Sequence, residues 1–444
     1  MDGLNLARMA EETGAPAPRR RWSLWLSLGL VATLVLCVAP VGVGVVVFRG
    51  LDSPAWPATP SAKAEPARSP VAGDADRVTA AWLRDKIGAA LTAQGTALLG
   101  GDQAGFLAIA DPASPAKATL SAQFASLRGM KITRWVPSAD SIPSSVGPQK
   151  WRTLVEVEHC FVEPDCKPMT ITYGTVWTDT AAGLKLVGVE PSMSTYDGPR
   201  PWEVDQLVVA RGKRVMVATT NALRGQLKTV LAEAEKAAVV ADRYAVGGPP
   251  PAHYEVFYAG TEQWKRWFGG SRPAWTAGYA LPVGGRQVDV VINAAAPQRN
   301  NLDDLLRHEM THASTMPQNG FPTSAWWLVE GIAELAASGG AAPQAYEGIE
   351  EVRKVVKERG WAGPLQDLKI ADGAADWEVA GAYGIGYLAV RQLAERFGEP
   401  DVLAFMKALT HDRMSIEEAS REVFGEPWSV LNDQCVAAVR AAAA

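Results

Sequence analysis

A run of 27 residues without a single charge, at positions 22–48, constrains this chain more than any other feature. A helix needs about 20 apolar residues to cross a bilayer, whereas the apolar core of a cleavable signal peptide has only about 7–15. An uncleaved transmembrane helix is therefore the preferred interpretation, and cleavage after the run is the alternative. Arg19, Arg20 and Arg21 precede the run and only Arg49 follows it closely. The positive-inside bias then places residues 1–21 in the cytoplasm and the bulk of the chain outside the plasma membrane.

The rest of the composition is that of a globular protein. With 444 residues the chain is long enough for two or three domains, and an apolar fraction of 48% excludes a disordered chain. The 43 Lys and Arg residues against 48 Asp and Glu residues give a formal net charge of −5. Nucleic acid is therefore not an expected partner, because phosphate binding needs concentrated positive charge.

Shifts in composition divide the chain into five segments, and the predicted fold class is α+β. A stretch rich in Pro, Ala and Ser predicts a semi-rigid linker after the apolar run. A helical opening followed by strands predicts a small α+β domain, and strands followed by many helices predict a larger one. The predicted segments are a cytoplasmic tail (1–21), a transmembrane helix (22–48), a linker (49–75), a small α+β domain (76–198) and a larger domain (199–444).

The small domain has no residue pattern that points to chemistry. Helices followed by an antiparallel meander loosely resemble the nuclear transport factor 2-like, cone-shaped domains, which implies a cone that either holds a ligand or spaces the next domain from the membrane. Cys160 and Cys166 flank the short segment FVEPD between two predicted strands. In an oxidising compartment this pair predicts a disulfide that closes a hairpin.

The most informative motif is His308-Glu309-Met310-Thr311-His312, an H-E-x-x-H sequence. Histidines four residues apart on a helix project from one face, so both imidazoles can bind one Zn²⁺ ion. Glu309, one position along, can reach a water on the metal and act as general base. The alternative is a solvated helix face that carries two histidines.

A third ligand is needed to complete such a site. A second predicted helix contains Glu330 and Glu334, one turn apart, within the apolar sequence WWLVEGIAE. Glu330 is the candidate third ligand, which leaves an open fourth position for water. Glu334 can accept the second N–H of a ligand histidine and fix its tautomer. An ordinary solvated pair of glutamates is the alternative.

The stretch from His308 to Glu334 resembles the gluzincin zinc metallopeptidases, and most of all the peptidase MA-like family. The resemblance continues through AYGIGYLAVRQLAERFG at 382–398 and covers most of residues 199–444. It implies a gluzincin-type domain with a mostly helical second half. The implied zinc ligands are His308, His312 and Glu330, with Glu309 as catalytic base and Glu334 as a supporting acid.

The same resemblance suggests how a substrate is handled. Aminopeptidase-type gluzincins use a downstream tyrosine to stabilise the oxyanion, and here Tyr383 and Tyr387 are both candidates, with Tyr383 preferred. No segment like G-A-M-E-N, which recognises a substrate amine, precedes the motif. The strand before the metal-binding helix follows the cleft edge in gluzincins, which implies that residues 287–294 pair with an extended substrate.

The preferred hypothesis is a membrane-anchored, extracytoplasmic zinc endopeptidase that cleaves a peptide or protein substrate. Glu309 would be its general base, and Zn²⁺ would be its cofactor. One alternative is a non-proteolytic surface module that binds a ligand and carries a structural or vestigial metal site. Another is a zinc hydrolase that acts on a different amide, such as a cell-wall crosslink. An intact Glu309 favours catalysis, because a purely structural site does not need it.

Overall fold

The computed structural model describes residues 67–71, 73–139, 141–192, 198–270, 272–296, 302–371 and 373–444. Residues 66–444 form one compact unit. The predicted cytoplasmic tail, the predicted transmembrane helix at 22–48 and most of the predicted linker lie outside the described residues. Within the ranges given above, no helix combines the length and the apolar character needed to cross a membrane.

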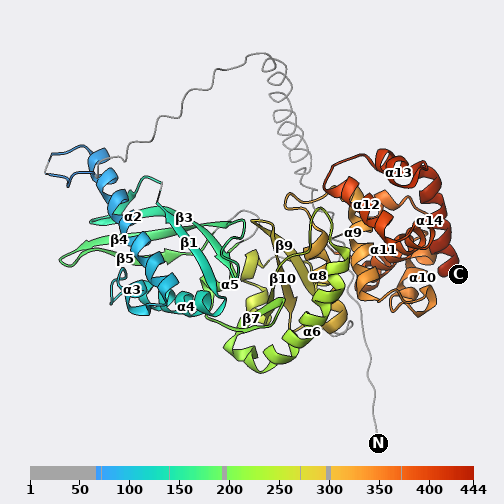
Figure 1. Cartoon of the computed structure of the whole chain (residues 1–444), viewed down its shortest axis with the longest axis horizontal. Helices are drawn as coiled ribbons and strands as arrows, with labels where there is room; N and C mark the ends of the chain where they lie inside the picture. Colours follow the sequence, from blue (N-terminus) through green and yellow to red (C-terminus); the bar gives the residue numbers. More distant parts are fainter. Residues whose placement is uncertain are drawn as a thin grey trace, which may run out of the picture. The chain divides into compact units, whose positions relative to one another are not determined.

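The first part of the described chain packs helices on an antiparallel sheet (Figure 1). The strand order is β1-β3-β4-β5, with β2 beside β3. β3 and β4 alternate buried and exposed side chains over much of their length, as strands do when one face covers a core. A disulfide joins Cys160 to Cys166 across the β3–β4 connection. The elements are α2 (Asp76–Gly100), α3 (Gln103–Leu107), α4 (Ala116–Gly129), β1 (Ile132–Ser138), β2 (Ser144–Gly147), β3 (Lys150–Phe161), β4 (Met169–Thr180) and β5 (Gly183–Glu190).

A short helix, α5 (Pro201–Val204), covers the buried face of this sheet. The ring of Trp202 is only 2% exposed, and its centroid lies 5.8 Å from that of Trp135 and 5.7 Å from that of His159. Glu203 accepts hydrogen bonds from the backbone N–H and the hydroxyl of Ser192, at 2.9 and 2.6 Å. The ring of Trp202 therefore fills part of the buried face of this sheet.

The second sheet is mixed, and both of its faces are buried. Its order is β6-β7-β8-β10-β9; β7, β8 and β10 are parallel, and the two outer strands are antiparallel to their neighbours. All six residues of β8 are buried, which is typical of a strand covered on both sides. The elements here are β6 (Leu207–Arg211), β7 (Val215–Thr220), α6 (Leu227–Ala241), β8 (Tyr254–Ala259), α7 (Thr261–Trp264), β9 (Gly278–Gly284), β10 (Gln287–Asn293) and α8 (Leu302–Thr315).

Each face of the mixed sheet belongs to a different core. On one face, Val217, Val256 and Val290 pack in a cluster with side chains of α6 and α8. On the other face, Phe257 and Val291 belong to the same buried cluster as side chains of α2, α4 and the first sheet. The first part of the chain and the mixed sheet therefore share one hydrophobic core, although the sequence predicts a domain boundary between residues 198 and 199.

The strand at the free edge is β9, not β10. Residues 287–294 were expected to follow the edge of the cleft, but β10 lies between β8 and β9, so this expectation is wrong. Gly284, Gly285 and Arg286 all have positive φ and form a tight turn that folds β9 back along β10. Because β10 also pairs with β8, β9 takes the outer position.

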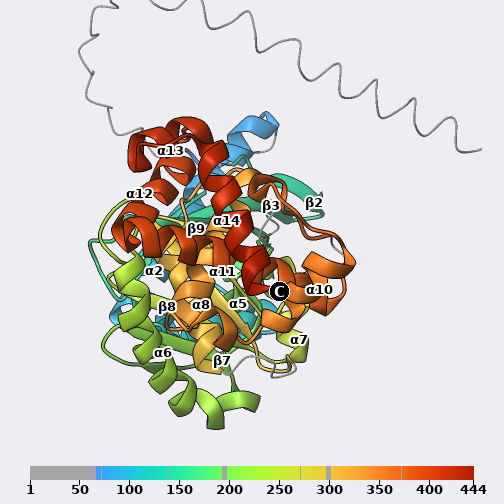
Figure 2. The same cartoon turned by 90° about the vertical axis from the view of Figure 1, so that its right-hand side faces the viewer.

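The remaining helices form a second half of the chain, and these helices face the viewer in Figure 2. They have a hydrophobic core of their own. α9 and α11 approach closely because Gly331 and Gly386 meet at the crossing. A Cβ atom at Gly331 would lie 2.4 Å from the carbonyl oxygen of Gly386, so no larger residue fits there. The helices are α9 (Trp326–Ala337), α10 (Ile349–Glu358), α11 (Asp376–Phe397), α12 (Glu399–Thr410), α13 (Ile416–Phe424) and α14 (Trp428–Ala442).

Two carboxyl groups are buried side by side in the mixed sheet. Glu255 of β8 and Asp289 of β10 are partners in the strand register and are 5% and 4% exposed. Burial raises the pKa of both groups, to about 7 for Asp289, while the Arg200 guanidinium opposes the rise. Asp289 also raises the pKa of Glu255. The folded protein therefore holds a proton here that an unfolded chain would release.

We expect Asp289→Asn to change how stability depends on pH. An unfolded Asp has a pKa of about 3.9, so between about pH 4 and pH 7 the folded state binds more protons than the unfolded state, and the free energy of unfolding falls as pH rises. The variant lacks this loss. Its free energy of unfolding relative to wild type should rise across this window, by an amount on the order of a few kcal/mol. Urea denaturation at several pH values measures the difference.

His159 also changes how stability depends on pH, but equally in wild type and variant. Burial lowers the pKa of its imidazole to about 4, so it makes stability rise with pH over part of the same window. This contribution is common to wild type and variant and cancels in the comparison. A wild-type-to-variant difference that stays constant with pH would contradict the buried ionisation of Asp289.

Candidate functional site

Helix α8 has an apolar side and a polar side. Leu306 and Met310 are fully buried against the mixed sheet and belong to its helix-covered core. His308 and His312 project from another side of the helix and are 7% and 5% exposed. Because Leu306 and Met310 fix the rotation of the helix, both imidazoles are directed toward α9.

Three side chains that can bind a metal meet between α8 and α9. The Nε2 atoms of His308 and His312 lie 3.2 and 3.1 Å from Oε2 of Glu330, and 3.1 Å from each other. In a tetrahedral zinc site with bonds of about 2.0–2.1 Å, neighbouring ligand atoms are roughly 3.3 Å apart. The three atoms therefore have the spacing of one face of such a tetrahedron, and the donor set fits zinc.

A hydrogen-bond chain orients one of the histidines. Nδ1 of His308 lies 3.0 Å from Oε1 of Glu334, and Oε2 of Glu334 accepts a hydrogen bond from the Tyr346 hydroxyl at 2.7 Å. When Nδ1 donates to Glu334, Nε2 of neutral His308 directs its lone pair at Glu330 and His312. Nδ1 of His312 is buried and has no hydrogen-bond partner among the described residues.

The buried acids and imidazoles change one another's pKa values. Burial by itself lowers the pKa of His308, but Glu330 and Glu334 raise it well above its ordinary value. Burial by itself raises the pKa of Glu330, but His312 and His308 together lower it to about 2. Glu330 is therefore an anion over the physiological range, as a carboxylate ligand must be.

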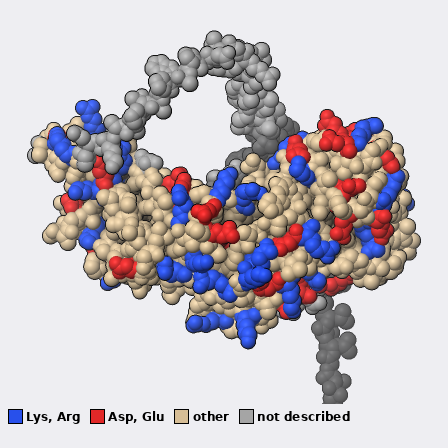
Figure 3. Space-filling view, in the orientation of Figure 1, with Lys and Arg blue, Asp and Glu red and all other residues tan. Residues whose placement is uncertain are grey.

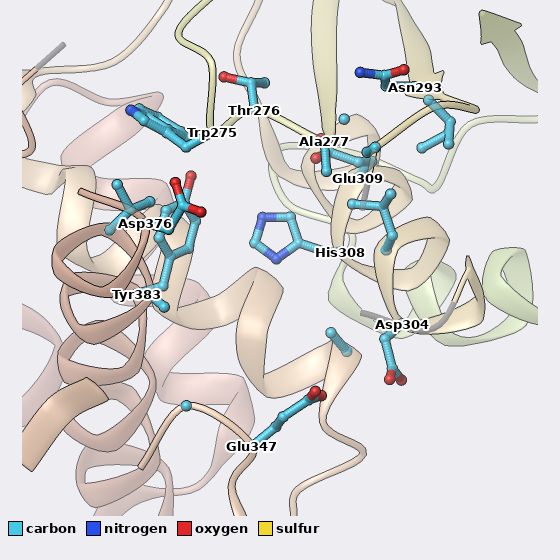
Figure 4. Close-up of a pocket in the computed structure, with 18 of the residues that line it drawn as sticks. Trp275, Thr276, Ala277, Asn293, Asp304, His308, Glu309, Glu347, Asp376 and Tyr383 are labelled. Carbon is cyan, nitrogen blue, oxygen red and sulfur yellow. The ribbon is translucent and has the colours of Figure 1, made fainter. Parts of the chain in front are cut away.

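Glu309 lies beside the ligand cluster and against β9. A Cβ atom at Gly278 would lie 2.9 Å from both Cγ and Oε1 of Glu309, so the glycine leaves room for this carboxyl group. Glu309 is 5% exposed, and burial raises its pKa even though His308 and His312 lower it. The carboxyl group lines the cleft next to His308 and faces Ala277 (Figure 4).

Tyr383 and Tyr387 of α11 lie in different surroundings. Tyr383 lines the cleft, and its ring centroid is 5.7 Å from that of His308. The Tyr387 hydroxyl instead donates a hydrogen bond to the carbonyl oxygen of Ala341, and its ring stacks on Tyr346 at 4.4 Å. The structure thus brings Tyr383 to the ligand cluster and keeps Tyr387 away from it.

The cluster opens into a cleft of about 1470 Å³. Figure 4 shows the segment 275–277 on one side of it, with Tyr383 and Asp376 of α11 nearby and Asp304 and Glu347 on the far side. Pockets for small molecules usually measure about 300–1000 Å³. This cleft is therefore large enough for several residues of a peptide.

Some parts of the site leave no signal in the sequence. Tyr346 lies in the connection between α9 and α10, Gly278 begins β9, and Trp275 lies in the loop before it. None of them belongs to a motif or to a periodic pattern. Their places depend on contacts between segments that are distant along the chain, so only the folded structure brings them to the site.

Comparisons with known proteins find only distant structural similarity. No protein-family model matches the chain, and no curated protein matches its sequence. Among solved structures, the M1 zinc metallopeptidase of Deinococcus radiodurans is similar over 60% of this chain and 58% of its own, at 18% identity and a TM-score of 0.34. Native yeast LTA4 hydrolase is similar over 57% and 42% of the two chains, at 13% identity and a TM-score of 0.33.

Within this chain, His308, His312 and Glu330 fit an H-E-x-x-H…E ligand pattern. A variant of the Deinococcus enzyme, with a TM-score of 0.34, was solved with a Tyr-Ser-Ala substrate. The chain spans less than two thirds of the length of either relative.

We expect Tyr346→Phe to weaken zinc binding about tenfold, at the low end of the effect of losing an outer partner of a metal ligand. The variant removes the hydroxyl that holds Glu334, and Glu334 holds His308. Competition with a chromophoric chelator measures the zinc affinity. Tyr244→Phe is the matched control, because Tyr244 is also buried and its hydroxyl forms no hydrogen bond with a described residue. Equal affinities for the two variants would contradict the role of the chain.

Proposed function

We propose that the chain is a zinc-dependent endopeptidase, anchored in the plasma membrane by residues 22–48, that acts on peptides or proteins outside the cytoplasm. The observation that carries the catalytic part is the meeting of His308, His312 and Glu330 at 3.1–3.2 Å beside the buried Glu309, at a large cleft. Zinc held by this set would supply a Lewis acid that polarises a carbonyl oxygen and lowers the pKa of a water toward about 7.

Glu309 is the group that moves the proton. Its carboxylate accepts a proton from the attacking water and returns it to the nitrogen of the leaving amine. Burial raises the pKa of Glu309, so its protonated form is more stable than that of an exposed glutamate. This helps the carboxyl group to hold the proton between the two steps.

Tyr383 is the proposed donor to the oxyanion that forms from the peptide carbonyl. Burial raises the pKa of its hydroxyl well above the ordinary value, and the carboxylates of Glu330 and Glu309 raise it further. The phenol therefore keeps its proton and can donate a hydrogen bond. Its ring lies against that of Trp326, with centroids 5.3 Å apart, which restricts its position at the cleft.

The edge strand β9 supports binding of an extended substrate. One side of an edge strand has backbone groups that are not used in sheet pairing, and a peptide can add to them as a further strand. A peptide added to β9 would pass Gly278 and therefore Glu309. Such pairing recognises backbone rather than a chain terminus, and this favours endopeptidase over aminopeptidase action.

The proposed location rests on the sequence. The charge-free run at 22–48, with Arg19–Arg21 before it, supports a single-pass anchor with its N-terminus in the cytoplasm. The Cys160–Cys166 disulfide is consistent with an oxidising, extracytoplasmic compartment. The substrates proposed for the site are therefore extracytoplasmic peptides and proteins.

We expect Glu309→Gln to abolish cleavage of an unfolded protein while about one zinc ion per chain stays bound. The amide is close in size to the carboxyl group but cannot accept the proton. Cleavage products are followed by mass spectrometry, and bound metal by elemental analysis. Glu358→Gln, an exposed position on α10, is the matched control and should cleave as wild type does. An active Glu309→Gln protein, or a wild type without metal, would refute the mechanism.

Two tyrosine variants test the choice of oxyanion donor. Tyr383→Phe should lower kcat by about 100-fold or more with little change in KM, because the missing hydroxyl would donate its hydrogen bond only in the transition state. Tyr387→Phe should keep kcat near wild type and lower the free energy of unfolding by about 1 kcal/mol, because it loses the hydrogen bond to Ala341. Steady-state kinetics and denaturation separate the two outcomes, and the reverse pattern would assign the role to Tyr387.

A further inference from the structure

A second pocket, of about 540 Å³, shares no residue with the metal cleft. We call it the basic pocket. Two of its segments come from the first part of the chain and two from the mixed sheet, so it lies where these parts meet. Its lining residues are Arg128, Lys131, Ile132, Val162, Arg211, Gly212, Lys213 and His253.

Positive charge converges on this pocket without a carboxylate in its lining. Lys131 follows α4, and Arg211 and Lys213 flank the turn between β6 and β7. None of these three side chains forms an ion pair or hydrogen bond with another described residue. Arg128 donates hydrogen bonds to the carbonyl oxygens of Leu98 and Leu99 at the end of α2. In Figure 3, Lys and Arg side chains gather over the region that carries α4 and β7 in Figure 1.

The carboxylate of Glu235 lies close to this pocket and accepts hydrogen bonds from backbone N–H groups. Oε1 of Glu235 accepts hydrogen bonds from the N–H groups of Arg214 and Val215, each at 2.9 Å, behind the β6–β7 turn. Arg214 itself pairs with Asp242. Glu235 keeps its negative charge beside Gly212, but it is a single acid against Lys131, Arg211 and Lys213, so the pocket retains net positive charge.

A half-buried imidazole adds a buried polar atom to the same pocket. Nε2 of His253 is buried and has no hydrogen-bond partner among the described residues. Burial lowers the pKa of His253 to about 4; nearby Glu235 raises it, and Arg214, Lys131 and Arg211 lower it. A neutral imidazole can donate one N–H, so His253 can add a directed hydrogen bond to the charge of its neighbours.

We infer that the basic pocket binds a phosphate-type oxyanion, which Lys131, Arg211 and Lys213 neutralise and to which His253 donates a hydrogen bond. Such a group offsets the net positive charge of the pocket and accepts a hydrogen bond from Nε2 of His253, which has no partner among the described residues. Because its ligands come from both parts of the chain, the anion also links the first sheet to the mixed sheet. The phosphate belongs either to a soluble compound or to the headgroup of an anionic lipid. This inference is independent of the proposed peptidase activity.

The test uses the full-length chain in detergent, titrated with inorganic phosphate by calorimetry and followed by thermal unfolding. We expect saturable binding of about one phosphate per chain and a phosphate-dependent rise in Tm. Lys131→Gln combined with Lys213→Gln should weaken binding about tenfold or more, because two charge-assisted contacts are lost. The charge-matched control is Arg224→Gln with Lys228→Gln, two exposed cations outside the pocket, and should bind as wild type does.

A second arm distinguishes the lipid source. The full chain is reconstituted in phosphatidylcholine nanodiscs with or without phosphatidic acid, and hydrogen exchange is measured at residues 128–132 and 211–213. Protection that needs phosphatidic acid and is lost in the Lys131 and Lys213 variant, without binding of free phosphate, assigns the pocket to a lipid headgroup. The inference is overturned if neither probe binds, or if the control loses binding as much as the pocket variant.

Discussion

The burial of α8 on two sides is the constraint on which the rest of the structure depends. Leu306 and Met310 fix the helix against the mixed sheet, and this fixes the direction of His308 and His312. Burying two imidazoles is costly unless they are paired with another group or bind a metal. Helix α9 supplies Glu330, which lies against both His308 and His312, and Glu334, which pairs with His308. The close crossing of α9 and α11 then brings Tyr383 to the same place.

The sequence predicts the parts of the site that depend on helical spacing. His308 and His312 are four residues apart, as are Glu330 and Glu334, and in each pair the side chains lie on one helix face whatever the surrounding fold. The choice between Tyr383 and Tyr387 needs the structure, because both lie on the same side of α11. Tyr383 lines the metal cleft, whereas Tyr387, one turn further along the helix, donates its hydrogen bond to the carbonyl oxygen of Ala341.

The α+β class also follows from the order of strands and helices, whereas the position of a strand in its sheet does not. The tight turn after β9 decides that this strand lies outside β10, and nothing in the apolar pattern of residues 287–294 differs between an edge and an interior strand covered on both faces. The same limit hides Trp202. Trp202 lies at the start of the predicted larger domain, and nothing in the sequence places it among the rings of Trp135 and His159 in the smaller one.

The shared core has a consequence for how the chain acquires its structure during synthesis. On one face, Phe257 and Val291 belong to a buried cluster that is built largely from the first sheet and its helices, which precede both residues in the sequence. The first sheet leaves the ribosome earlier and can already be folded when β8 and β10 emerge. It then offers an apolar surface on which the strands of the mixed sheet assemble. Residues 76–190 would thus act as an intramolecular template for the part of the chain that carries the metal ligands.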